Sequence, residues 1–339
     1  MLYIRADMNE KIATGHVMRC LAVADAAKIK GEDTTFILAD HQGVEPIRRR
    51  GYRCVVLHSQ WNDMEGELPA LLAVIQDYKI HRLLVDSYQV TANYLKQLKQ
   101  HVELFYLDDL NAFCYPVDAL ICYANYWEKF QYHKRCKQIK LYLGTRYIPL
   151  KKAFFYCPKK QVKLQAENLL LLSGGTDPYH VLSNILERID RELYGKITVI
   201  CGIYYSNYPS LCKTYAAEKN IRIYQGVPDI EHYMDEADLA VSAGGTTLYE
   251  LCAVGTPAIS YSIADNQLEN VKKFQEDGLI PYAGDARKDP VIDQIVDYLE
   301  FLCKNRRARQ EQSLKMQELV DGKGALRIAD ALMDERRIK

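Results

Sequence analysis

Short, continuous apolar runs rich in leucine and β-branched residues recur along this sequence, separated by segments with helical periodicity. Strands that are apolar on both faces are typical of a parallel sheet covered by helices on both sides. In the N-terminal half these runs are residues 2–7, 35–39, 54–58, 82–86, 104–108, 119–123 and 141–144. The pattern therefore predicts a doubly wound α/β domain.

A second domain is expected because 339 residues exceed what one hydrophobic core usually supports. The alternation lapses in a charged, proline-containing stretch around residues 148–160 and resumes at Asn168, so we divide the chain into domains 1–155 and 156–339. The second domain alternates predicted strands 168–172, 197–201, 221–224, 239–242 and 258–262 with predicted helices 180–193, 211–219, 230–236 and 246–254. Its predicted fold is again Rossmann-like.

The last part of the chain, residues 291–303 and 309–333, is amphipathic and predicts a helical tail, broken at Gly322-Lys323-Gly324. We assign the tail to the second domain. By analogy with other proteins built from two such domains, a helical tail of this kind can also pack back against the first domain. The tail could carry an oligomer interface as well, so the oligomeric state stays open.

Composition excludes several classes of function. With 44 basic and 44 acidic residues, the chain has no net positive charge that would attract nucleic acid. Ten cysteines at irregular spacing, without a Cys-x-x-Cys pair, argue against a zinc site or a disulfide framework. No segment is apolar for the length of a membrane span, and the N-terminus enters a strand directly. We expect a cytoplasmic protein without stable membrane insertion and without a metal.

His16 is the first candidate for chemistry. It follows Gly15 where a strand, a polar loop and a helix succeed one another, an arrangement that presents backbone N–H groups and one chosen side chain to a ligand. Imidazole changes charge near neutral pH, and a helix N-terminus disfavours its protonated form, so a neutral His16 could accept a proton from water. Alternatively, His16 is only a helix-start residue.

Two glycine pairs in the second half are candidates for phosphate binding. Gly174, Gly175 and Thr176 follow one predicted strand, and Gly244, Gly245 and Thr246 follow another. Glycine permits a sharp turn and a close ligand approach, and a following helix directs its N–H groups at an anion. Glu250, one helical turn after Thr246, could accept both ribose hydroxyls. Alternatively, each glycine pair only permits a tight turn between strand and helix, and Glu250 is a solvent-exposed helical glutamate.

Polar side chains also follow several predicted strands. Asp86-Ser87-Tyr88, Asp108-Asp109 and Asn125 stand where a ligand crevice would lie in the first domain. In the second domain, Asp265-Asn266-Gln267 offers amides suited to sugar hydroxyls and acetamido groups, although Asp265 or Asn266 could equally be a helix N-cap. Arg5 and Arg19 could contact phosphate or pair with Asp7.

Together these motifs resemble a known family. Gly244-Gly245-Thr246-Thr247-Leu248-Tyr249-Glu250, Gly255-Thr256-Pro257-Ala258 and Asp265-Asn266-Gln267 are similar to the nucleotide-binding half of GT-B proteins related to MurG glycosyltransferases. Arg5-Ala6-Asp7 with Gly15-His16-Val17-Met18-Arg19-Cys20 narrows the resemblance to the PseG and SpsG-like family of UDP-sugar hydrolases. Further matches are Asp86-Ser87-Tyr88, Asp108-Asp109, Asn125, Leu143-Gly144-Thr145-Arg146-Tyr147 and Ser173-Gly174-Gly175-Thr176-Asp177.

The resemblance implies a GT-B fold, two Rossmann-like domains facing across a cleft. It implies hydrolysis of UDP-2,4-diacetamido-2,4,6-trideoxy-β-L-altrose to UDP and the free sugar, in pseudaminic acid biosynthesis, with no cofactor and no metal required. His16 would be the general base, and Tyr88 and Asn266 would place water or sugar. Gly15, Arg19, Asn125, the two glycine pairs with Thr176 and Thr246, Glu250 and Gln267 would bind the substrate.

Two rival functions use the same residues. In a MurG-type glycosyltransferase the base activates an acceptor hydroxyl, and a membrane-bound acceptor would call for an apolar or basic patch that the first domain does not strongly show. A binding module without turnover is the third hypothesis, and the intact His16 and Tyr88 argue against it.

Overall fold

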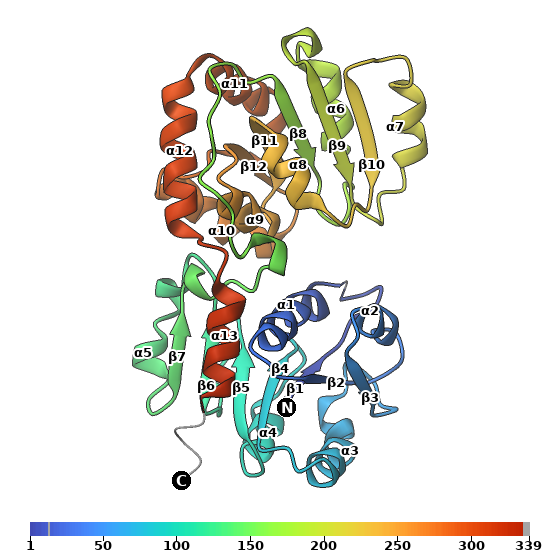
Figure 1. The fold of residues 1–339 in the computed structure, drawn as a ribbon, viewed down its shortest axis with the longest axis vertical. Coiled ribbons are helices and arrows are strands. Elements are labelled where there is room, and N and C mark those ends of the chain that lie inside the picture. The colour runs from blue at the N-terminus through green and yellow to red at the C-terminus, as the bar shows by residue number, and fades with distance from the viewer. Residues whose placement is uncertain (13, 335–339) are drawn as a thin grey trace. The chain divides into compact units, whose positions relative to one another are not determined.

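The computed structural model describes residues 1–12 and 14–334 of the chain. The chain divides into two compact units (Figure 1). The first unit contains Met1–Phe155 together with the segment that begins at Gly322, and the second unit is Tyr156–Asp321. The two units are described separately below.

The first unit is built on a parallel sheet with the strand order β3-β2-β1-β4-β5-β6-β7. Strand β1 pairs with both β2 and β4, so the chain changes direction across the sheet between β1 and β4. The strands are β1 (Leu2–Ala6), β2 (Thr34–Leu38), β3 (Arg53–Val56), β4 (Arg82–Asp86), β5 (Glu103–Leu107), β6 (Ala119–Cys122) and β7 (Lys140–Leu143).

The central strands of this sheet are buried throughout because helices cover both of its faces. Every residue of β1 and β2 is buried, as their continuous apolar sequence predicts. One face packs Tyr3, Ile37 and Leu83 into a core with side chains of α3 and α4. The helices before residue 156 are α1 (Gly15–Ile29), α2 (Val44–Arg49), α3 (Met64–Asp77), α4 (Ala92–Leu98) and α5 (Tyr132–Arg135), with short 3-10 turns at Trp127–Phe130, Thr145–Tyr147 and Lys152–Phe154.

The C-terminal helix α13 (Gly324–Met333) belongs to the first unit, where it packs against α1 (Figure 1). Lys30 Nζ lies 2.6 Å from Asp330 Oδ1, and Arg327 donates to the carbonyl of Arg146 at 2.9 Å. The assignment of all residues after 156 to the second domain is therefore wrong for α13. Its apolar face finds its partners on α1 and beside the 3-10 turn at Thr145–Tyr147.

The joint before α13 depends on Gly322. Its φ of +73° favours glycine, and a Cβ built there would overlap the carbonyl oxygen of Phe154. We expect Gly322→Ala to lower the free energy of unfolding by about 2–4 kcal/mol, measured as a lower thermal midpoint. Gly31→Ala is the matched control, because Gly31 has a φ of +82° but no atom within 4 Å of its added Cβ. Equal losses in both variants would contradict the proposed overlap.

The second unit has a parallel sheet with the order β10-β9-β8-β11-β12-β13. Its change of direction lies between β8 and β11, since β8 pairs with both β9 and β11. The strands are β8 (Asn168–Leu172), β9 (Lys196–Cys201), β10 (Ile221–Gln225), β11 (Leu239–Ala243), β12 (Ala258–Ser262) and β13 (Tyr282–Asp285). The helices are α6 (Val181–Arg188), α7 (Tyr208–Thr214), α8 (Ile230–Glu236), α9 (Thr247–Val254), α10 (Asp265–Glu276), α11 (Val291–Lys304) and α12 (Arg306–Leu319), with a 3-10 turn at Arg191–Leu193.

The predicted pair of doubly wound parallel sheets is confirmed, and the differences are local. The predicted helix 180–193 ends at Arg188, because Ile189 is extended and Asp190 starts a separate 3-10 turn by accepting from Glu192 N. Strand β13 was not predicted. It is short, contains Gly284, and completes one edge of the sheet by pairing with β12.

Candidate functional site

The candidate site of the first unit lies at the carboxyl edge of its sheet, where the chain changes direction between β1 and β4. His16 stands in the first turn of α1, which follows β1, and Asp86 is the last residue of β4. Asp109 and Tyr123 follow β5 and β6. In open α/β sheets, ligands bind at this edge and at this change of direction.

His16 and Asp86 form a buried pair. His16 Nδ1 lies 2.7 Å from Asp86 Oδ1, and both side chains are almost fully buried. Because an ionised carboxylate only accepts hydrogen bonds, Nδ1 donates its proton to Asp86. His16 Nε2 has no hydrogen-bond partner in the part of the chain that is described. It is therefore the nitrogen left to accept a proton.

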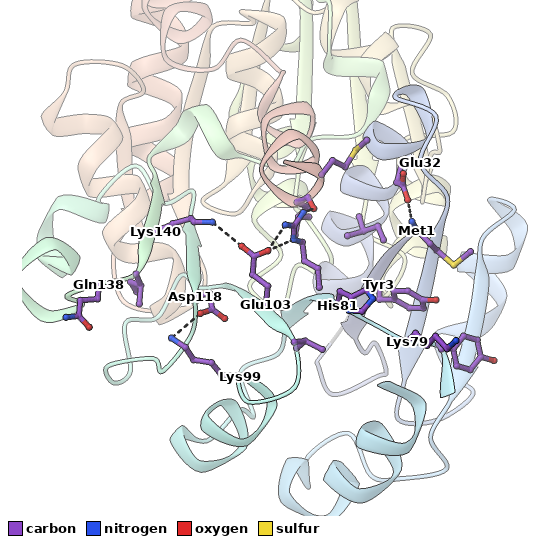
Figure 2. A pocket seen from close by; sticks show the side chains of 17 residues that line it. Met1, Tyr3, Glu32, Lys79, His81, Lys99, Glu103, Asp118, Gln138 and Lys140 are labelled. Atoms are coloured by element: carbon purple, nitrogen blue, oxygen red, sulfur yellow. Dashed lines mark hydrogen bonds and ion pairs between the residues drawn. The ribbon is translucent and has the colours of Figure 1, made fainter. Parts of the chain in front are cut away.

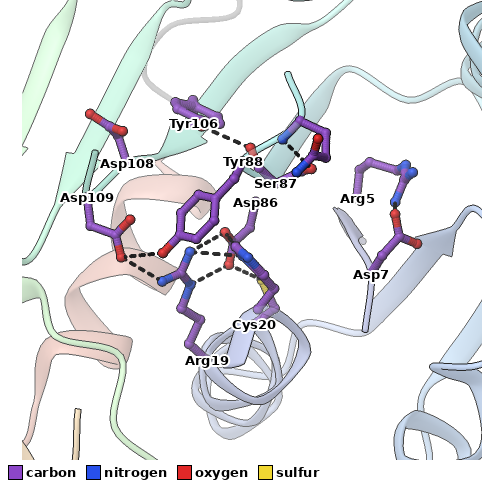
Figure 3. A network of polar contacts seen from close by, with 12 residues as sticks. Arg5, Asp7, Arg19, Cys20, Asp86, Ser87, Tyr88, Tyr106, Asp108 and Asp109 are labelled. Atoms are coloured by element: carbon purple, nitrogen blue, oxygen red, sulfur yellow. Dashed lines mark hydrogen bonds and ion pairs between the residues drawn. The ribbon is translucent and has the colours of Figure 1, made fainter. Parts of the chain in front are cut away.

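Arg19 lies one turn after His16 and binds both carboxylate oxygens of Asp86 (Figure 3). Its Nε donates to Asp86 Oδ2 at 2.6 Å and its Nη2 to Asp86 Oδ1 at 2.5 Å. Burial alone would raise the pKa of Asp86, but the charge of Arg19 and the hydrogen bonds from Arg19 and His16 outweigh it and lower that pKa. Asp86 is thus a permanent anion beside the imidazole.

The remaining donors of Arg19 also face protein groups. Nη1 donates to Asp109 Oδ2 at 3.0 Å and to the hydroxyl of Tyr123 at 2.6 Å, and Nη2 lies 3.0 Å from His16 Nδ1. The phosphate contact expected for Arg19 is not favoured in this arrangement, because Nε, Nη1 and Nη2 already donate to Asp86, Asp109 and Tyr123. The alternative expectation, a carboxylate partner, holds with Asp86 and Asp109 in place of Asp7.

Tyr88 lies between these groups. Its ring meets the ring of His16 edge to face, with centroids 4.5 Å apart. Its hydroxyl donates to Asp109 Oδ2 at 3.0 Å (Figure 3). Asn125, which follows β6, is buried on the same edge of the sheet. Gly15 is exposed, and an added Cβ there would meet no atom within 4 Å.

Arg5 has a structural role beside the site. It is fully buried and binds Asp7 through Nη1 at 2.5 Å and Glu67 through Nε at 2.8 Å, while Tyr94 donates to Glu67 at 2.7 Å. Asp7 also accepts from the amide of Ala39 at 2.8 Å. This network ties the end of β1, and hence the start of the loop toward His16, to α3, α4 and the end of β2. Of the two expectations for Arg5, pairing with Asp7 is the one the structure has.

In the second unit the two glycine pairs differ. α6 begins only at Val181, and both oxygens of buried Asp177 accept from its first amides, Val181 N and Leu182 N, each at 2.9 Å. The expectation that a helix follows Gly174 and Gly175 at once with free N–H groups is therefore wrong, because a carboxylate already occupies them. Gly174, Gly175 and Thr176 form an exposed turn, and Gly174 has a φ of +76°.

The second pair leads directly into α9, whose start no side chain caps. Gly244 is buried, and a Cβ there would overlap Val271 of α10. Gly245 has neither a positive φ nor any atom within 4 Å of an added Cβ. Folding therefore explains Gly244 but not Gly245, whose missing side chain leaves room for an approaching ligand. Thr246 is exposed, and Glu250 is half-buried in the first turn of α9 rather than fully exposed.

The 265–267 segment forms the start of α10. Its N-cap is Ala264, so the N-cap alternative for Asp265 and Asn266 is wrong. Asp265 instead pairs with Arg287 at 2.7 Å, and Gln267 Oε1 accepts from the amide of Ile263 at 2.9 Å. Asn266 is exposed. The turn from β12 into α10 is thus closed by Gln267.

A concave surface lies at the opposite, amino edge of the first sheet. This open groove has a volume of about 1040 Å³ (Figure 2). Its main charges neutralise one another: Glu103 accepts from Arg82 at 2.7 Å and from Lys140 at 3.0 Å, and Lys99 lies 3.3 Å from Asp118. Burial would raise the pKa of Glu103, but the hydrogen bonds and charges of Arg82 and Lys140 lower it.

The sequence placed Asp86 and Asp109 at the expected crevice but assigned neither a role in catalysis or binding, and it did not single out Tyr123. The available signal was their position at the ends of β4, β5 and β6, because parallel strands end at one common edge. No group of three or more His, Cys, Asp or Glu side chains within residues 1–12 and 14–334 is arranged to hold a metal ion. In the same described part, none of the helices combines the length and the apolar character that a membrane span requires.

Comparison with known proteins adds to this geometry. Residues 169–327 match the glycosyltransferase family 28 C-terminal domain. The spore coat polysaccharide biosynthesis protein SpsG of Bacillus subtilis is 22% identical over 98% of this chain and 97% of its own length. A Helicobacter pylori protein named pseudaminic acid cytidylyltransferase and UDP-2,4-diacetamido-2,4,6-trideoxy-beta-L-altropyranose hydrolase is 26% identical over 58% of this chain but only 37% of its own length. The crystal structure of MurG from Acinetobacter baumannii aligns over 98% of both chains with a TM-score of 0.67 at 14% identity, a likeness of fold.

Proposed function

We propose that this chain, an SpsG-like protein with the GT-B fold and a glycosyltransferase family 28 C-terminal domain, is an enzyme that hydrolyses a UDP-linked sugar. The proposed substrate is UDP-2,4-diacetamido-2,4,6-trideoxy-β-L-altrose, the sugar nucleotide in the name of the Helicobacter pylori relative. The observation that carries the proposal is the His16 Nδ1 to Asp86 distance of 2.7 Å, which leaves Nε2 as a proton acceptor.

In the proposed reaction a water molecule donates a hydrogen bond to His16 Nε2, and its oxygen attacks the anomeric carbon. The bond from that carbon to the diphosphate oxygen breaks, the water's proton passes to His16, and UDP leaves with the electron pair. Asp86 stabilises the imidazolium that forms, as a buried carboxylate does in hydrolytic triads. Tyr88, whose ring touches His16, helps to place the water.

The second unit is proposed to hold the UDP part. Gly245 and the uncapped start of α9 offer backbone N–H groups and open space to a phosphate. Glu250 would accept from the ribose hydroxyls, and Asn266 and Gln267 would contact the sugar. Gly174, Gly175 and Thr176 remain proposed contacts through their exposed turn, without a helix N-terminus behind them.

UDP release from a panel of UDP-sugars, measured without any acceptor, tests this function. We expect release from the diacetamido-trideoxy sugar, with free sugar as the second product. If no donor releases UDP, hydrolysis is wrong, and a search for an acceptor would test the glycosyltransferase alternative.

Glu250→Ala is expected to weaken UDP binding by roughly 1–3 kcal/mol, because a half-buried carboxylate that accepts from ribose would be lost. Isothermal titration calorimetry with UDP measures the change. Glu276→Ala removes an exposed glutamate from the end of α10 and is the matched control. Unchanged UDP affinity in Glu250→Ala would remove the ribose assignment.

A further inference from the structure

Asp109 receives an unusual concentration of hydrogen bonds on one oxygen. Its Oδ2 accepts from Arg19 Nη1 at 3.0 Å, from the Tyr88 hydroxyl at 3.0 Å and from the Tyr123 hydroxyl at 3.1 Å. Its Oδ1 is buried and has no hydrogen-bond partner among the described residues. Figure 3 shows Asp109 facing Tyr88 and Arg19 from the end of β5. The hydrogen bonding of this carboxylate is thus directed at these three side chains.

The contact with Asp109 fixes the direction of the hydrogen bond that the Tyr88 hydroxyl donates. A carboxylate beside a guanidinium accepts and does not donate, so the proton of the Tyr88 hydroxyl points at Asp109. Burial raises the pKa of Tyr88, Arg19 opposes that rise and Asp109 adds to it, so the side chain remains a protonated phenol. Toward any further group, the Tyr88 oxygen can then act only as an acceptor.

A carboxylate likewise fixes His16 as a hydrogen-bond acceptor. Its Nδ1 proton points at Asp86, which leaves Nε2 as an acceptor. One guanidinium, that of Arg19, holds both carboxylates, and the two rings lie 4.5 Å apart. The site therefore presents two neighbouring acceptors, His16 fixed by the buried Asp86 and Tyr88 fixed by the half-buried Asp109.

We propose that Asp109 is a positioning residue that fixes Tyr88 as a hydrogen-bond acceptor beside His16, and that the resulting pair of acceptors selects water over an alcohol as the nucleophile. Water has two O–H bonds and satisfies both acceptors, while a lone pair of its oxygen stays free to attack. An alcohol has one O–H bond and leaves one acceptor unpaired, which carries a cost wherever bound substrate excludes water from that acceptor. This inference rests on the proposed hydrolysis and names the feature that separates it from glycosyl transfer.

The first test is kinetic. We expect Asp109→Ala to lower kcat about 100-fold, the scale of a misplaced reacting group, while UDP affinity stays unchanged. Because Asp109 acts through Tyr88, the double variant Asp109→Ala/Tyr88→Phe should be no slower than Tyr88→Phe alone. Asp109→Asn can keep a carbonyl oxygen toward Arg19 and Tyr88 and should retain most of the activity lost in Asp109→Ala. Losses that multiply in the double variant, or a parallel fall in UDP affinity, would overturn the role of Asp109.

The second test addresses the choice of nucleophile. Wild-type enzyme in buffer containing methanol should form free sugar and little methyl glycoside. In Asp109→Ala and Tyr88→Phe the ratio of methyl glycoside to free sugar should rise, because one acceptor is misdirected or missing. A merely structural role would lower both products together, and an unchanged ratio in these variants would sink the selection of water.

The third test needs no turnover. With 3-fluorotyrosine incorporated, the ¹⁹F resonance of position 88 is identified by its absence in Tyr88→Phe and is followed as the pH rises. Since Asp109 raises the pKa of Tyr88, Asp109→Ala should shift that titration to lower pH. An unshifted titration would refute the contact itself. Wild type that releases no UDP from any donor, yet shows the shift, would refute the proposed hydrolysis and the selection of water while leaving the contact established.

Discussion

Replacing His16 with alanine is expected to lower kcat for UDP-sugar hydrolysis by roughly 10²–10⁴-fold, the usual contribution of a general base. The variant loses the only acceptor that the Asp86 contact orients, since His16 Nδ1 is committed to that carboxylate at 2.7 Å. UDP binding should stay unchanged, because the proposed UDP contacts lie in the second unit. UDP release and calorimetry with UDP measure the two quantities separately.

His101→Ala is the matched control, since His101 is exposed and stands before the start of β5, at the edge of the sheet away from His16. It should retain full turnover. Undiminished turnover in His16→Ala would remove His16 from the mechanism, and a loss of UDP affinity equal to the loss of kcat would make it a binding residue.

Replacing Asp86 with asparagine is expected to cost about 10³–10⁴-fold in kcat, because the amide no longer enforces the Nδ1–H tautomer or stabilises the imidazolium. The same change should lower the thermal midpoint, since Arg19 loses the charge of a fully buried partner that it binds at 2.5 and 2.6 Å. UDP affinity should again be unchanged.

The stabilisation from Asp86 has a defined pH dependence. Its pKa is lowered in the folded protein, so this contribution is complete above the ordinary carboxyl pKa near 4 and is lost as the pH falls toward the folded value. The variant should therefore lose less stability than wild type on acidification below about pH 4. Thermal melts of both proteins across this range measure the difference.

Asp25→Asn is the control for Asp86→Asn. Asp25 lies on α1 and, like Asp86, pairs with an arginine: it accepts from Arg50 at 2.9 Å and, in addition, from Tyr52 at 2.6 Å. It should affect stability without affecting kcat. If Asp86→Asn keeps wild-type kcat, the buried pair with His16 is structural and the proposed mechanism loses its basis.

Much of the fold could be predicted from the sequence because its signals are local. Continuous apolar runs such as 82–86 and 239–242 form buried parallel strands whatever the neighbouring strand is, and Gly15 and His16 begin α1 as predicted. The placement of α13 could not be predicted in this way. Its amphipathic pattern specifies an apolar face but not the surface that covers it, which is α1 of the first unit.

Some residues of the candidate site could likewise be found from local sequence, whereas others depend on contacts between distant parts of the chain. Residue type and position after a strand pointed to His16, and the resemblance to the family pointed to Tyr88, since both signals depend on local sequence order. The roles of Arg19, Asp86 and Asp109 depend on contacts between residues separated by 67 and 90 positions in the chain. No local pattern distinguishes an arginine that binds phosphate from one that clamps two carboxylates.

The sequence by itself determined two doubly wound sheets, the strand ends at which polar groups gather, and a histidine at a helix start. Only the tertiary structure decided that Arg19 joins Asp86 to Asp109, that Asp177 closes the start of α6, and that Gly245 rather than Gly244 leaves open space. The physical reason is that backbone conformation and burial follow from neighbouring residues and their periodicity. The direction of a hydrogen bond, in contrast, is set by whichever side chains the fold brings within about 3 Å of each other.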